Sequence, residues 1–162
     1  MELKETIEEL EKTKEFKEWK KEHPQYYLAH GFMMPEESTE WQVGYTDGDK
    51  ITTFFVYPIQ ILPEQECYKE PGDKVKKLDK DELKLSLEKA KEIFDKTKKE
   101  KYRAETILKT IIIVQNNGKN IYNITGLAMS MKTLNVKIDM EGKVISDSLF
   151  SIMDQVKGEA GK

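Results

Sequence analysis

Hydrophobic residues recur near the start of the chain at the spacing of an α-helix. The apolar positions fall at i, i+4 and i+7 and then three residues apart on a rotated stripe: Leu3, Ile7, Leu10, Phe16 and Trp19. This pattern predicts a helix over residues 3–22 that ends before Pro24. Because the second stripe is rotated, we expect either a bend near Thr13 or a second half that packs against a different surface.

Strand patterns follow in the rest of the first half. The apolar run over residues 26–34 predicts a buried strand with a bulge at Gly31. Residues 41–57 alternate on either side of an Asp-Gly-Asp sequence, which predicts a hairpin because Asp and Gly tolerate positive φ in tight turns. Pro58 marks an edge or a bulge before the short apolar run at residues 59–62.

A second helix is expected after a loop over residues 63–75. Asp79 or Asp81 is suited to cap this helix, which ends near Lys98. Its apolar stripe falls at i, i+4, i+7 and i+11: Leu83, Leu87, Ala90 and Phe94. The pattern therefore begins the second half of the chain in the same way as the first.

Further strands and a short helix complete the pattern. Strands are expected at residues 106–115, 121–128 and 134–140, and a further short strand begins at 144–145. Apolar and polar residues alternate most regularly in the strand at 134–140. Asn116-Asn117-Gly118 has the composition of a hairpin turn. The spacing i, i+3, i+4 and i+7 predicts a final amphipathic helix that contains Leu149, Ile152, Met153 and Val156.

The order of these elements predicts the α+β class. We expect two helix-plus-antiparallel-meander units (αβββ-αβββ), with helices packed on antiparallel sheet and a short C-terminal helix. The predicted division is residues 1–62, a loop at 63–75, a second half at 76–157 and a frayed tail at 158–162, together one compact unit. The two halves are expected either to share one sheet or to pack their sheets together.

Composition narrows the classes of function. Of 162 residues 35% are charged, but 27 basic and 30 acidic side chains leave a net charge of -3. Arg103 is the single arginine, and acidic residues are interleaved among the lysines, so nucleic-acid binding is not expected. With one cysteine, Cys67, the chain forms no internal disulfide.

The apolar segments of the chain predict the cellular location of the protein. No apolar run reaches the roughly 18–20 residues of a membrane span. The first residues lack the basic start and apolar stretch of a secretory signal, which predicts a cytoplasmic protein. An exported protein trimmed of its signal would look the same.

Few residues are suited to catalysis. The two histidines, His23 and His30, are expected at a helix end and inside an apolar strand, respectively. The chain contains no nucleophile elbow, no glycine-rich phosphate loop and no zinc or calcium ligand spacing. We therefore expect no enzyme activity, no cofactor and no metal site.

Residues 81–146 resemble a PepSY-type domain. The resemblance rests on the helix around Ser86-Leu87-Glu88-Lys89-Ala90, on Tyr122-Asn123-Ile124-Thr125, and on the hairpin Leu134–Val144. In that hairpin Asp139 and Gly142 match the family pattern of an aspartate, two residues and a glycine. The aspartate is expected to accept backbone N–H bonds across the turn while the glycine adopts positive φ. The first half resembles a diverged second copy, since a hairpin follows Trp41.

The resemblance implies a non-catalytic module. PepSY-like domains are associated with peptidase propeptides, inhibition and envelope regulation, which implies protein or peptide binding through a sheet face or edge. A second copy of this chain is a further candidate partner.

The aromatic residues of the first half are the candidate binding residues. Phe54 and Phe55 point to opposite faces of one strand, so at least one of them needs cover beyond a single sheet–helix interface. We expect a ligand- or partner-facing surface formed by Trp41, Tyr45, Phe54, Phe55 and Tyr57. The alternative is a small-molecule-binding protein or small enzyme, with a cystatin- or NTF2-like curved sheet and a pocket near His30 and Trp41.

Overall fold

A computed structural model of the chain describes residues 1–67 and 74–152. The first half contains α1 (Leu3–Lys12), α2 (Lys14–Glu22), β1 (Tyr27–Met33), β2 (Gln42–Thr46), β3 (Lys50–Val56), β4 (Ile59–Ile61) and β5 (Gln65–Glu66). The second half contains a short 3₁₀ helix, η1 (Lys80–Glu82), and then α3 (Leu87–Lys101), β6 (Ile107–Asn116), β7 (Asn120–Ala128), β8 (Lys132–Asp139) and β9 (Val144–Ser151).

The nine described strands form one antiparallel sheet. Its order is β4-β3-β2-β1-β6-β7-β8-β9, and β5 also pairs with β3. The two halves of the chain meet in the middle of the sheet, where His30 pairs with Gln115 and Met33 with Ile112. The structure confirms the α+β class and the antiparallel sheet, and the two halves share a single sheet.

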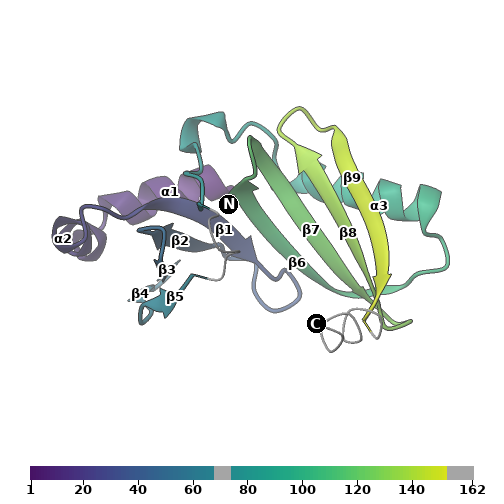
Figure 1. Cartoon of the computed structure of the whole chain (residues 1–162), viewed down its shortest axis with the longest axis horizontal. Helices are drawn as coiled ribbons and strands as arrows, with labels where there is room; N and C mark the ends of the chain where they lie inside the picture. The colour runs from purple at the N-terminus through teal and green to yellow at the C-terminus, as the bar shows by residue number, and fades with distance from the viewer. Residues whose placement is uncertain (68–73, 153–162) are drawn as a thin grey trace.

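The three described α-helices pack on one face of this sheet. Figure 1 shows α1 and α2 beside the end that contains β1–β3, and α3 behind the end that contains β8 and β9. Side chains of all three helices belong to one buried cluster with the inward-facing strand residues, such as Leu134, Val136 and Ile138 of β8. Burial of this apolar surface is the main force that holds the helices on the sheet.

Thr13 separates α1 from α2, as the rotated apolar stripe predicts. Its hydroxyl donates to the Leu10 carbonyl at 2.7 Å and accepts from the Phe16 backbone N–H at 3.2 Å, so one residue ends α1 and caps α2. Ile7 and Leu10 are buried on α1, while α2 buries Phe16 and Trp19. The change of direction lets both apolar stripes contact the sheet.

The β8–β9 turn has the expected aspartate and glycine geometry. The Asp139 carboxylate accepts from the backbone N–H groups of Glu141 at 3.0 Å and Lys143 at 2.8 Å. Gly142 has φ 85°, which favours glycine because it has no Cβ. The hairpins predicted around residues 47–49 and 116–118 are also confirmed.

Three predicted boundaries in the first two-thirds of the chain are wrong. The irregularity in β1 lies between Leu28 and His30 and not at Gly31. The helix of the second half begins after Ser86, which caps α3, whereas Asp79 caps the separate η1 and Leu83 lies between them. The expected loop over residues 63–75 contains the short strand β5.

The predicted C-terminal helix begins later than expected, because Ile152 is helical but Leu149 is not. Leu149 lies in β9 and pairs with Leu134 of β8, so the strand continues through Ser151. Seven residue pairs with β8 give the backbone of this segment hydrogen-bond partners, which outweighs a short helical spacing. Met153, Val156 and the predicted tail at 158–162 lie outside the described residues.

Candidate functional site

Three of the six predicted site residues lie in the core. Trp41, Tyr45 and Phe54 are buried between the sheet and the helices, where the Phe16 ring lies 5.0 Å from Tyr45 and 5.5 Å from Phe54. The interior of a helix–sheet interface accounts for their apolar character. They therefore face the helical layer.

The other three lie outside this core and do not converge with it. Phe55 is half-buried on the opposite face from Phe54, as expected. Tyr57 is exposed in the turn before β4. His30 is also on the face away from the helices, where it packs against Gly44 so closely that a Cβ there would lie 2.5 Å from the imidazole Cε1.

His30 and Trp41, around which a pocket was expected, lie on opposite faces of the sheet. His30 pairs with Gly44 of β2, so the two side-chain positions share a face, whereas Trp41 is buried on the helix side with Val43 and Tyr45. The sheet lies between the two residues. Burial lowers the pKa of His30, so its imidazole is neutral at pH 7.

None of the described helices covers the second face of the sheet. Near its middle this face carries apolar pairs such as Phe32 opposite Ile113. Toward β8 it becomes polar, because the Asn135 side chain donates to Asn123 at 2.6 Å and to Thr125 at 3.0 Å. The face therefore combines an apolar centre with a hydrogen-bonded polar flank.

The edge strand β9 is long and carries little charge. It has eight residues, and among the described strands it pairs with β8 alone, through seven residue pairs with an irregularity at Ile145; the opposite edge strand β4 has three residues. Asp147 is its single charged residue, and that carboxylate is bound by Tyr102 and Lys101. Ile145 and Phe150 are 45% and 51% exposed. Natural sheets usually protect such an edge with lysine, proline or a cover.

An exposed apolar tip adjoins β9. It consists of Leu108, Met129, Met131 and Phe150, which come from β6, the β7–β8 turn and β9. Backbone hydrogen bonds hold these segments together, from Met129 N–H to the Thr106 carbonyl and from Ile152 N–H to the Met131 carbonyl. Met131 has φ 67°, which is uncommon for a side chain other than glycine. Clustered exposed methionines are typical of adaptable binding surfaces.

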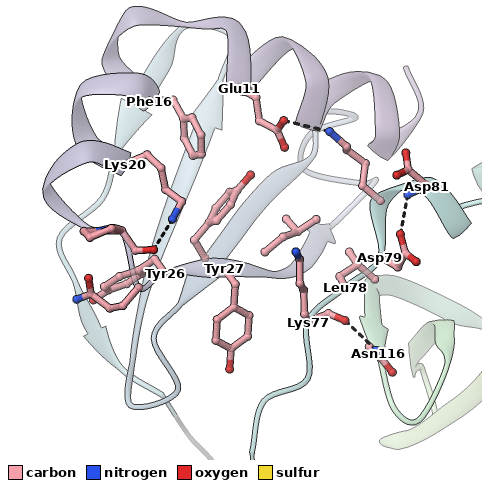
Figure 2. Close-up of a pocket in the computed structure, with 15 residues that line it drawn as sticks. Glu11, Phe16, Lys20, Tyr26, Tyr27, Lys77, Leu78, Asp79, Asp81 and Asn116 are labelled. Carbon is pink, nitrogen blue, oxygen red and sulfur yellow. Dashed lines mark hydrogen bonds and ion pairs between the residues drawn. The ribbon is translucent and has the colours of Figure 1, made fainter.

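A polar crevice of about 990 Å³ opens on the helix side of the sheet. Figure 2 shows that α1 and α2, the start of β1, the segment 77–81 and Asn116 at the end of β6 surround it. The segment 77–81 is held in place by the Asn116 side chain, which donates to the Lys77 carbonyl at 2.8 Å, and by Asn120, which donates to the Asp79 carbonyl at 2.7 Å. The crevice therefore lies where the two halves of the chain meet.

Three acids and three lysines line this crevice: Glu11, Asp79, Asp81, Lys20, Lys77 and Lys80. Lys80 pairs with Glu11 at 3.0 Å, and this hydrogen bond is the main cause that raises the lysine pKa. Lys20 donates to the Pro24 carbonyl at 2.8 Å. The lining thus has no net formal charge, and part of it is neutralised by its own contacts.

Two buried polar atoms of the crevice have no hydrogen-bond partner among the described residues. They are the Tyr45 hydroxyl oxygen and the Asn116 side-chain oxygen. Tyr45 is 4% exposed, and its pKa is raised first by this burial and then by the nearby Glu11 carboxylate, which lies close to the hydroxyl without reaching hydrogen-bond geometry. Buried polar atoms are usually paired, because leaving one unpaired costs about 1–3 kcal/mol.

Sequence reasoning did not find the crevice or the β9 edge. The crevice residues are contributed by segments far apart in the chain, and no local pattern joins Glu11 or Tyr45 to Asn116. The sequence did contain one indication of the β9 edge: residues 144–151 include a single charged residue, although 35% of the whole chain is charged.

The described residues contain neither a cluster of metal ligands nor a helix that could span a membrane. Within residues 1–67 and 74–152, no three His, Cys, Asp or Glu side chains lie together in a way that could hold a metal ion. None of the helices described has the length and apolar character needed to cross a bilayer.

Comparison with known proteins gives a likeness of fold. No family model matches the chain, and no curated protein matches it significantly in sequence. A solved structure, that of a putative lipoprotein from Clostridium difficile 630, superposes with a TM-score of 0.50 and 13% identity over 83% of this chain and 90% of that chain. At this identity the similarity establishes a shared arrangement of helices and strands and nothing about activity.

Proposed function

We propose that this protein is a non-catalytic binding module that accepts an extended peptide segment of a partner protein as an additional strand along β9. The observation that carries the proposal is the eight-residue edge strand with a single charge, Asp147, which the helical layer already binds. An edge strand offers a row of backbone N–H and C=O groups to an incoming strand, and pockets beside alternate side chains supply specificity.

The exposed residues near this edge indicate the chemistry of the peptide. Ile145 and Phe150 lie on β9, and the methionines of the apolar tip lie beside its end. A segment with apolar residues at alternate positions would cover these side chains while its backbone pairs with the edge. The partner is therefore proposed to be a protein with an extended, apolar and weakly charged segment.

The PepSY resemblance supports the same proposal. We propose that the sheet is built from two PepSY-like halves, each a helix followed by a meander. The sheet order runs outward from the β1–β6 junction through β2, β3 and β4 on one side and through β7, β8 and β9 on the other, as a duplicated unit would. Such modules bind proteins or peptides, and β9 is the outermost described strand of the half that carries the resemblance.

Selection from a display library of short random peptides tests this function. The peptides that bind the wild-type protein are expected to alternate apolar residues and to lose about tenfold in affinity to Ile145→Lys and Phe150→Lys, because a lysine on the edge disfavours strand pairing. The matched control is Ile61→Lys in β4, which is similarly exposed on the opposite edge and should leave affinity unchanged.

The same variants identify the source of the added strand. Dimerisation of the wild type that Ile145→Lys removes, measured by light scattering during size-exclusion chromatography, would assign the strand to a second copy of this chain. Peptides whose affinity falls equally in Ile61→Lys and in the β9 variants would contradict the proposal.

A further inference from the structure

We propose that Met129 and Met131 of the apolar tip are an oxidation-sensitive modification site, and that their conversion to methionine sulfoxides releases the peptide from β9. This inference rests on the proposed function and names its regulation. The two side chains are 69% and 60% exposed, whereas Met33 and Met140 are buried in the core. Because a dissolved peroxide must reach the thioether sulfur, the methionines of the tip are expected to react well before the buried ones.

The two methionines lie beside the end of the proposed binding strand. They flank Ser130 in the turn between β7 and β8. The Met131 carbonyl accepts from the N–H of Ile152, the residue that follows β9, at 3.0 Å. Figure 1 shows this turn and the end of β9 at the same end of the sheet. A peptide paired along the whole of β9 would therefore end against the turn that carries both methionines.

The modification is the transfer of one oxygen atom from a peroxide to the thioether sulfur. The sulfur forms a bond to oxygen and is oxidised by two electrons, while the O–O bond of hydrogen peroxide breaks and the peroxide is reduced to water. Both protons of the peroxide leave with that water, so no further reactant is needed. The product is a polar side chain with a hydrogen-bond acceptor in place of an apolar one.

The sulfoxides are expected to weaken binding without unfolding the protein. In the free protein their oxygens remain in water, because both side chains are more than half exposed. In the complex they lie against the apolar residues of the peptide, where a polar atom without a partner is costly. Oxidation therefore destabilises the bound state and leaves the free state as it is, and such a difference between the two states is what changes an affinity.

Peroxide treatment of the full chain, followed by peptide mapping with mass spectrometry, tests the reactivity. Hydrogen peroxide is expected to oxidise Met129 and Met131 about tenfold faster than Met33 and Met140, or faster still. Met1 is 66% exposed in the other half of the chain and provides the internal reference for an exposed methionine away from β9. Equal rates at the tip and in the core would overturn the proposal.

The affinity for a selected peptide without methionine, measured before and after oxidation, tests the release. Peroxide is removed before the peptide is added, and the oxidised wild type is expected to bind about tenfold more weakly with an unchanged midpoint of urea unfolding. The matched control is the double variant Met129→Leu with Met131→Leu, which keeps the tip apolar and still oxidises at Met1. It should bind the peptide equally well before and after treatment.

The outcomes separate this inference from the proposed function. A peptide that pairs with β9 at the same affinity after both methionines are oxidised would overturn the inference and leave the proposed function standing. A loss of affinity that persists in the leucine double variant would also overturn it, because the sensitive residue would then lie elsewhere. Failure of the unoxidised wild type to bind any selected peptide along β9 would contradict the proposed function and this inference with it.

Discussion

The Tyr102 hydroxyl donates a 2.6 Å hydrogen bond to the Asp147 carboxylate, and this contact joins the helical layer to the outermost strand. Lys101 at the end of α3 approaches the same carboxylate at 2.9 Å. The contact orders the edge strand against α3 and occupies the only charged side chain that β9 has. Within the described strand β9, no other charged side chain remains to repel a partner strand.

Loss of the Tyr102 hydroxyl should make stability less dependent on pH. Its hydrogen bond, followed by that of Lys101, lowers the pKa of Asp147 below the ordinary value. A lowered pKa adds stability that is present above about pH 4 and is lost as the pH falls through the folded-state value. We expect Tyr102→Phe to cost about 1–2 kcal/mol in urea unfolding at neutral pH and much less at strongly acidic pH. An equal cost at both pH values would show that the bond does not favour the ionised carboxylate.

Two aspartate turns provide a matched pair for a stability test. Asp139 is buried and accepts two backbone N–H bonds, and Asp47 accepts bonds from Asp49 at 2.9 Å and Lys50 at 2.8 Å in a more exposed turn. Asp139→Ala is expected to cost about 2 kcal/mol and Asp47→Ala about 1 kcal/mol, because water replaces the lost bonds more easily at the exposed site. Chemical denaturation measures both, and the reverse order would contradict the role given to burial.

The close approach of His30 to Gly44 predicts that substitutions at these two positions have coupled effects on the free energy of unfolding. A Cβ at residue 44 would lie 2.5 Å from the His30 Cε1 atom, so Gly44→Ala should destabilise the protein by about 1–3 kcal/mol. Replacing the ring as well, in His30→Ala with Gly44→Ala, should recover part of this loss because the space is then open. A double-mutant cycle measures the coupling, and strictly additive costs would argue against the contact.

The Tyr45 hydroxyl has no partner in hydrogen-bond geometry among the described residues, which leads to an unusual prediction for the free energy of unfolding. Removing it in Tyr45→Phe should leave the free energy of unfolding unchanged or raise it by up to about 1 kcal/mol, because no hydrogen bond is lost. By contrast, Tyr122→Phe loses the 2.7 Å bond to Leu85 and should cost about 1 kcal/mol. Thermal unfolding of the protein alone compares the stability of these two variants with that of the wild type. A clear loss of stability in Tyr45→Phe would mean that its hydroxyl has a structural partner.

The local features of the fold could be predicted from sequence. Alternation from Leu134 to Met140 and the turn at Asp139 each depend on a few consecutive residues, and both are confirmed. The break at Thr13 was visible as a rotation of the apolar stripe. Leu149 was assigned to a helix because a short apolar spacing fits either element, and only pairing with β8 decides between them.

The candidate sites depend on relationships that one segment does not contain. His30 and Trp41 both come from apolar stretches, and their placement on opposite faces follows from the register of β1 against β2. The crevice combines Glu11, Tyr45 and Asn116, which come together only when both halves join one sheet. Cross-strand register and the order of strands are therefore the information that the residue pattern lacked.

Amide hydrogen exchange with and without a selected peptide tests strand addition at β9 most directly. We predict that exchange slows along Val144–Ser151, because each new backbone hydrogen bond protects an amide on the outer side of β9, while exchange at Ile59–Ile61 in β4 is unchanged. Peptide binding that protects another surface and leaves the amides of Val144–Ser151 exchanging at their original rates would contradict the account.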